Sequence, residues 1–221
     1  MVKMNYAART LMSFLSFNIG WWACALGASH DHPWLGPAVL PLFVGLHLYY
    51  SPTRKGECLF LILLGAIGFV IDTIFIHVGL FKLSPDGLLA PPWLIGTWIL
   101  LGQTYESMLM MRKTPALLAL SGGFSGPFAY YCFEALDILE YRRPLWISLA
   151  LHAVFWAAAT FALFVVRDWC LKLFPVAPTV LVGQPVPTDW VAAPPLPADQ
   201  TASPPTSQAA HPATSSRPGK S

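Results

Sequence analysis

Residues Cys58–Phe81 read CLFLILLGAIGFVIDTIFIHVGLF, and this stretch decides the fold. It is apolar apart from one carboxylate, Asp72, and a histidine near its far end, His77. At about 1.5 Å of helical rise per residue, a helix of this length crosses the roughly 30 Å hydrocarbon layer of a bilayer. The stretch therefore predicts a membrane-spanning helix.

Asp72 carries the charge of this predicted helix, and glycines share its face. At about 100° per residue, Gly65, Gly68 and Gly79 lie within about 60° of Asp72 on a helical wheel. Small residues let membrane helices approach closely. A charged side chain near the middle of such a helix costs roughly 2.5–3.5 kcal/mol. We therefore expect Asp72 to point into protein and to mark the functional site.

The composition places the whole chain in the membrane class. Of its 221 residues, 55% are hydrophobic and 11% are charged, which is too apolar for a soluble domain. The net charge of +2 comes without a basic cluster, so we expect no nucleic-acid partner. The four cysteines stand singly and no nucleotide-binding motif occurs, so we expect no metal and no cofactor.

Hydropathy along the chain predicts an all-α, polytopic membrane protein with six transmembrane helices. The predicted helices cover about residues 8–28, 33–50, 58–81, 93–111, 115–133 and 145–166, within a domain of residues 1–174. Residues 175–221 are rich in Pro, Ala, Ser and Thr. Such a segment buries too little apolar area to offset the entropy lost on ordering, so we expect a disordered tail.

The distribution of Lys and Arg predicts the orientation. With six helices, one side of the membrane carries eight of these residues and the other carries three. The larger group is Lys3, Arg9, Arg54, Lys55, Arg112, Lys113, Arg167 and Lys172, and the smaller is Lys82, Arg142 and Arg143. Because positive charge is enriched in cytoplasmic loops, both termini are expected in the cytoplasm.

Four ionisable side chains are candidate catalytic residues. Counting helical rise from the span centres places Asp72 and His152 roughly 4 and 6 Å outward of the midplane, and Glu106 and His47 roughly 6 and 7 Å inward. Two stacked pairs, Asp72 with His152 and Glu106 with His47, would suit a proton relay or a polar path. Alternatively, Glu106 extends to the headgroups and each histidine makes a local hydrogen bond.

Candidate substrate-binding residues come mainly from a polar seam on the predicted fourth helix. The candidates are Asn18, Asp72, Trp98, Gln103, Thr104 and Tyr105. In the fifth helix, Gly122-x-x-x-Gly126 followed by Pro127 predicts close packing with a local break.

The order of several motifs resembles a family of small bacterial inner-membrane proteins known only as a domain of unknown function. The motifs are Asn18 with Trp21 and Trp22, Ser51-Pro52-x-Arg54, Gly68-x-x-x-Asp72, Pro92-Trp93-Leu94 with Trp98, and Gly122-x-x-x-Gly126-Pro127 with Tyr130 and Glu134. The resemblance covers roughly residues 5–167. It implies a multi-pass location in the inner membrane and brings no activity.

Three functions remain open on the sequence. The first is handling or transport of a small or lipid-like molecule through a bundle centred on Asp72. The second is an intramembrane enzyme acting on a lipid or isoprenoid, with Asp72 or Glu106 as general acid. The third is a membrane scaffold whose polar residues only hold helices together. Membrane lipids are the expected partners, and the oligomeric state stays open.

Overall fold

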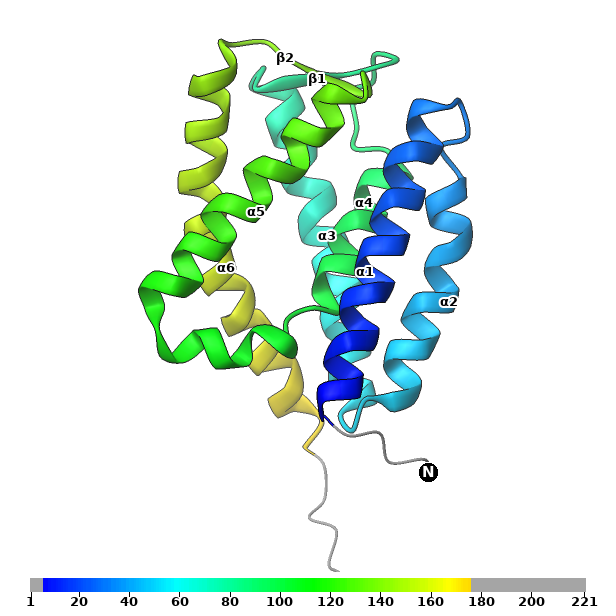
Figure 1. The fold of residues 1–221 in the computed structure, drawn as a ribbon, viewed down its shortest axis with the longest axis vertical. Coiled ribbons are helices and arrows are strands. Elements are labelled where there is room, and N and C mark those ends of the chain that lie inside the picture. The colour runs from blue at the N-terminus through cyan, green and yellow to red at the C-terminus, as the bar shows by residue number, and fades with distance from the viewer. Residues whose placement is uncertain (1–5, 176–221) are drawn as a thin grey trace, which may run out of the picture. The chain divides into compact units, whose positions relative to one another are not determined.

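The computed structural model describes residues 6–175, which form a helical bundle (Figure 1). Its elements are α1 (Tyr6–Ser29), α2 (Leu35–Tyr50), α3 (Arg54–His77), β1 (Phe81–Leu83), α4 (Pro92–Gly102), the 3₁₀ helix η1 (Ser107–Lys113), α5 (Pro115–Ala135), β2 (Leu139–Tyr141) and α6 (Leu145–Leu173). The predicted disordered tail, apart from Pro175, lies outside the described residues.

Successive α-helices run in opposite directions, so the bundle has two distinct ends (Figure 1). The start of α1, the start of α3, η1 and the end of α6 lie at one end, which we call the charged end. The strands β1 and β2 lie at the opposite end, which we call the ribbon end. The described chain therefore begins and finishes at the same end of the bundle.

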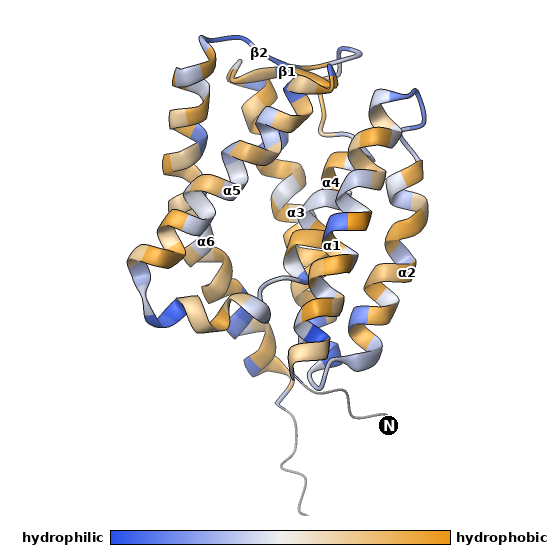
Figure 2. Cartoon of the chain, in the orientation of Figure 1, coloured by the Kyte–Doolittle hydropathy of each residue, from blue (hydrophilic) through white to orange (hydrophobic). Residues whose placement is uncertain are grey.

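Among the described residues, three helices are long and apolar enough to cross a membrane, namely α1, α3 and α6. The helices α2 and α4 are also apolar but shorter. Most residues of the helices are hydrophobic, and the hydrophilic ones are most frequent near the helix ends (Figure 2). This distribution is typical of a membrane protein.

The third helix is shifted from its predicted bounds. It begins at Arg54 and ends at His77, and the chain then turns through Gly79, whose φ of 69° a glycine adopts without strain. Gly79 therefore lies beyond the helix and does not share the face of Asp72, contrary to prediction. Gly65 and Gly68 do lie within α3.

The predicted fourth helix, residues 93–111, is wrong, because the chain leaves the α-helix after Gly102. A Cβ on Gly102 would lie 2.5 Å from Cδ2 of Leu61, so the glycine allows the end of α4 to pack closely against α3. Beyond it, Thr104 and Ser107 hydrogen-bond to nearby backbone carbonyls, which competes with regular helix.

Glycines in α5 bring that helix close to α6, as the G-x-x-x-G pattern predicts. A Cβ on Gly122 would collide with Thr160, and a Cβ on Gly126 would collide with the ring of Trp156. The predicted local break is wrong, because α5 continues through Pro127 to Ala135.

The two-stranded ribbon was not expected from the sequence. β1 and β2 pair antiparallel, with Lys82 opposite Glu140, and the two side chains form an ion pair of 2.8 Å. The hydrogen bond to Glu140 raises the pKa of Lys82. Because β1 follows α3 and β2 precedes α6, the ribbon links these helices at one end.

Candidate functional site

Asp72 lies near the end of α3 and is fully buried. The indole Nε1–H of Trp98, from α4, donates to its Oδ2 over 2.8 Å. The hydroxyl of Tyr130, from α5, donates to its Oδ1. No Lys, Arg or His among the described residues lies within ion-pair distance of the carboxylate. Asp72 is thus held by two aromatic donors from two other helices.

Gly68 makes this arrangement possible. It lies one turn before Asp72 on α3, and a Cβ at Gly68 would collide with the indole ring of Trp98. The missing side chain lets the ring lie against α3, where its N–H reaches the carboxylate. As expected, a glycine lies beside Asp72 on α3, and the space that it leaves is occupied by the Trp98 ring.

His152, from α6, is fully buried but forms no hydrogen bond with Asp72. Its Nδ1 lies 3.0 Å from the backbone carbonyl of Ser148, while its Nε2 has no partner among the described residues. Its ring lies 4.5 Å from the ring of Tyr130, centroid to centroid. The hypothesised direct pair is therefore replaced by an arrangement in which Tyr130 contacts both residues.

A small chamber of about 60 Å³ adjoins this cluster. Trp98 and Tyr130 form part of its wall, so it reaches the two donors that hold Asp72. The other lining residues are mostly apolar: Phe17, Trp21, Thr97, Leu101, Ser125, Gly126, Ala129, Phe133 and Trp156.

A larger cleft of about 780 Å³ lies between α1 and α5. Four residues line both the cleft and the chamber: Phe17, Leu101, Ser125 and Trp156. On α1 the cleft is lined by Tyr6, Ala7, Thr10, Leu11, Phe14 and Phe17, which follow helical spacing. Opposite them lie Ser121, Gly122 and Ser125 of α5. The cleft and the chamber are therefore neighbours that share part of their walls, and the chamber is the one that reaches the partners of Asp72.

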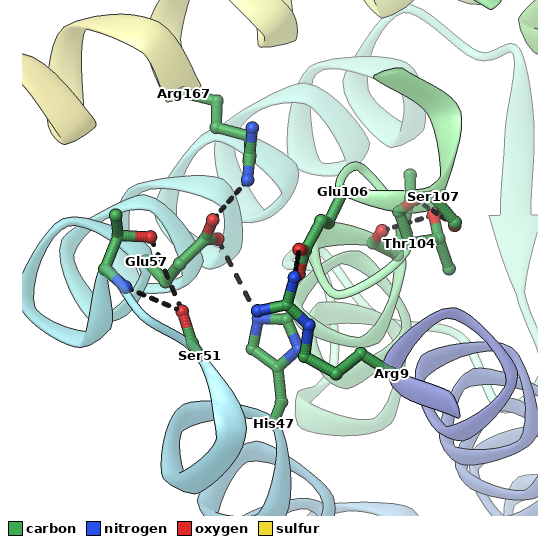
Figure 3. Close-up of polar contacts among 10 residues, drawn as sticks. Arg9, His47, Ser51, Glu57, Thr104, Glu106, Ser107 and Arg167 are labelled. Carbon is green, nitrogen blue, oxygen red and sulfur yellow. Dashed lines mark hydrogen bonds and ion pairs between the residues drawn. The ribbon is translucent and has the colours of Figure 1, made fainter. Parts of the chain in front are cut away.

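The second hypothesised pair, Glu106 with His47, is wrong. Glu106 forms an ion pair of 2.8 Å with Arg9 of α1 (Figure 3). His47 lies 3.8 Å from Glu57 of α3, and the buried Glu57 carboxylate also pairs with Arg167 of α6 (Figure 3). Counting helical rise gives the depth of a residue in the membrane but not the direction of its side chain, so it could not identify Arg9 and Glu57 as the partners.

The remaining predicted binding residues are divided. Thr104 and Tyr105 line the cleft. Asn18 does not, because its amide donates to the carbonyl of Phe14 one turn earlier on α1. Gln103 is fully buried, and neither amide atom has a partner among the described residues.

Sequence reasoning missed several residues of this region as candidates. Tyr130 and Trp156 were not singled out, because an aromatic residue in an apolar helix is usually part of the core. Glu57 and Arg167 lie just outside the predicted helices 58–81 and 145–166, although each lies within a helix in the structure. Their opposite charges at the same end of two helices are the signal that could have paired them.

The donor set suits an organic molecule better than a metal. Among the described residues no group of three His, Cys, Asp or Glu side chains could hold a metal ion. Apolar walls with a few convergent polar groups are typical of small-molecule sites.

Comparison with known proteins gives a family but no activity. The family model described as Protein of unknown function (DUF2878) matches residues 10–162, which include Asp72, Trp98, Tyr130 and His152. No curated protein and no solved structure matches the chain.

Proposed function

The chain belongs to the family described as Protein of unknown function (DUF2878), and we propose that it binds a lipid-like molecule within a membrane. The observation that carries this proposal is the cleft between α1 and α5. It is about 780 Å³ in volume, lined mainly by apolar side chains, and built partly from two helices long enough to span a bilayer. Its lining suits acyl or isoprenoid chains.

We propose that the six α-helices lie in the bacterial inner membrane, with the N-terminus and the C-terminus of the chain both in the cytoplasm. Seven of the ten Lys and Arg residues between residues 6 and 175 lie toward the charged end: Arg9, Arg54, Lys55, Arg112, Lys113, Arg167 and Lys172. The other three lie toward the ribbon end. The positive-inside rule then assigns the charged end to the cytoplasm.

The break after α4 supports a binding role for this region. Irregular backbone at membrane depth occurs where it is buried in protein or lines a cavity. Here Gln103 and Tyr105 are buried, and Thr104 lines the cleft. A short helix that stops beside a cavity is also a feature of membrane proteins that bind substrates between helices.

Photocrosslinking tests the proposal. The purified chain in lipid nanodiscs would be exposed to a photoactivatable fatty acid, and the labelled residues mapped by mass spectrometry. We expect labels on cleft residues such as Phe14 and Met108. Ser125→Trp, which places a large ring in the cleft, should reduce this labelling at least fivefold.

Leu120→Trp is the matched control, because Leu120 is exposed on the same helix and lines neither the cleft nor the chamber. It should leave cleft labelling unchanged. Labelling spread evenly over the exposed apolar surface, or unaffected by Ser125→Trp, would contradict the proposal.

An intramembrane enzyme is the second candidate, and the Tyr130–Asp72 hydrogen bond favours it. Tyr130 lines the chamber, so its hydroxyl could pass a proton between a bound substrate and the carboxylate. Glu106 is less suited to this role because it pairs with Arg9. If the protein is an enzyme, Asp72→Asn should retain crosslinking and abolish the lipid product seen in cells that carry the wild-type chain.

A further inference from the structure

Two stacked tryptophans line the chamber, and their N–H groups differ. The rings of Trp98 and Trp156 lie 4.7 Å apart at an interplanar angle of 26°. The N–H of Trp98 donates to Asp72. The N–H of Trp156 has no acceptor among the described residues, although the side chain is 94% buried. The Trp98 N–H is therefore already hydrogen-bonded, whereas the Trp156 N–H is available to a ligand.

A buried indole N–H without an acceptor is unusual. The indole N–H can only donate a hydrogen bond, so it needs an acceptor and cannot pair with another donor. Buried polar groups are nearly always paired, and an unpaired one points to a partner that the protein itself does not supply. Trp156 lines both the chamber and the cleft, which places it where a ligand would lie.

Ser125 supplies a second donor in the same place. Its side chain is exposed and lines both the chamber and the cleft, and no hydrogen bond joins its hydroxyl to another described residue. It directly precedes Gly126, whose missing side chain lets the Trp156 ring pack against α5. Ser125 and Trp156 therefore flank the junction between the two cavities.

We propose that the ligand of the cleft carries a carbonyl oxygen that accepts hydrogen bonds from Trp156 Nε1–H and Ser125 Oγ–H. This rests on the proposed binding of a lipid-like molecule and names its chemical class: an oxygenated chain, such as a ketone or an ester. A carbonyl oxygen has two lone pairs and can accept from both donors. A plain hydrocarbon would leave both donors unpaired.

Competition between two matched probes tests the inference. A long-chain alkane and a methyl ketone of equal chain length would each compete with the photoactivatable fatty acid for the full chain in nanodiscs. The ketone should compete about 25-fold more effectively, because each of its two neutral hydrogen bonds contributes a factor of about five. Trp156→Phe, which keeps a stacked ring, should reduce this preference to about fivefold and leave the alkane's effect unchanged.

Two further variants complete the test. Ser125→Ala should reduce the preference without disturbing the ring stack. Trp169→Phe, at an exposed position of α6 outside both cavities, should retain it in full.

The possible failures are distinguishable. If neither probe competes in the wild-type chain, the proposed function itself is wrong. If both probes compete equally, or if either Trp156→Phe or Ser125→Ala leaves the ketone preference unreduced, lipid binding stands and the carbonyl assignment is overturned.

Discussion

At the scale of single residues, the site depends on one missing side chain and one carboxylate. Gly68 leaves room for the Trp98 ring, and Asp72 accepts the N–H that this ring presents. The sequence already indicates that Asp72 faces protein, since a glycine lies one turn before it. It could not identify Trp98 and Tyr130 as partners, because that depends on how three helices are rotated against one another.

Gly68→Ala should destabilise the protein, because the added Cβ would collide with Trp98. Overpacking of this kind costs about 1–3 kcal/mol in the free energy of unfolding. Gly45→Ala in α2 is the matched control, since a Cβ there meets nothing within 4 Å. It should be neutral or stabilise by up to about 1 kcal/mol. Equal melting temperatures for the two variants in detergent would refute the packing argument.

Asp72→Leu and Asp72→Asn should differ in stability. Leucine would leave the Trp98 N–H and the Tyr130 hydroxyl without an acceptor, at about 1–3 kcal/mol for each donor. Asparagine can accept from Trp98 through Oδ1 and donate to Tyr130 through Nδ2, so its cost should be about 1 kcal/mol or less. Chemical unfolding in detergent measures both. A leucine variant as stable as the asparagine variant would mean that these hydrogen bonds contribute little.

At the scale of elements, helix existence was easier to predict than helix ends. The long apolar runs identify all six α-helices, because a bilayer core admits few other structures. The break after Gly102 was missed, because the polar residues from Gln103 to Ser107 were interpreted as one face of a helix that continues to Met111. In the structure, Thr104 and Ser107 instead hydrogen-bond to nearby backbone carbonyls. The ribbon was missed because strands of three residues leave too little pattern to detect.

The buried pair between α3 and α6 makes an element-scale prediction. Arg167→Met should leave the Glu57 carboxylate buried with only His47 nearby, which costs about 3–5 kcal/mol in the free energy of unfolding. Adding Glu57→Gln removes that charge and should restore most of the loss. A double-mutant cycle in detergent measures the coupling. If the double variant is no more stable than Arg167→Met alone, the ion pair is not the cause.

At the scale of the whole molecule, the proposed orientation rests on the charge distribution and on the even number of α-helices between residues 6 and 175. Asp86 lies between β1 and α4, toward the ribbon end, and Lys113 ends η1 at the charged end; both are exposed. One cysteine is introduced at each position in a background in which the partly exposed Cys58 and Cys132 are replaced by alanine and the buried Cys24 and Cys170 are kept. Its labelling reports the side of the membrane on which the ribbon end or the charged end lies.

Asp86→Cys should react with a membrane-impermeant maleimide on intact cells, whereas Lys113→Cys should react only after permeabilisation. The expected result follows from the excess of Lys and Arg at the charged end. The reverse pattern would invert the proposed orientation and leave the fold unchanged.

The double connection between α3 and α6 has a mechanical consequence. These helices are joined through the ribbon at one end and through Glu57 and Arg167 at the other, so they resist sliding past each other. On the other side of the cleft, Arg9 and Tyr6 of α1 both contact Glu106, just before η1. Widening the cleft at this end would therefore require these two contacts to break, while α3 and α6 stay joined at both of their ends.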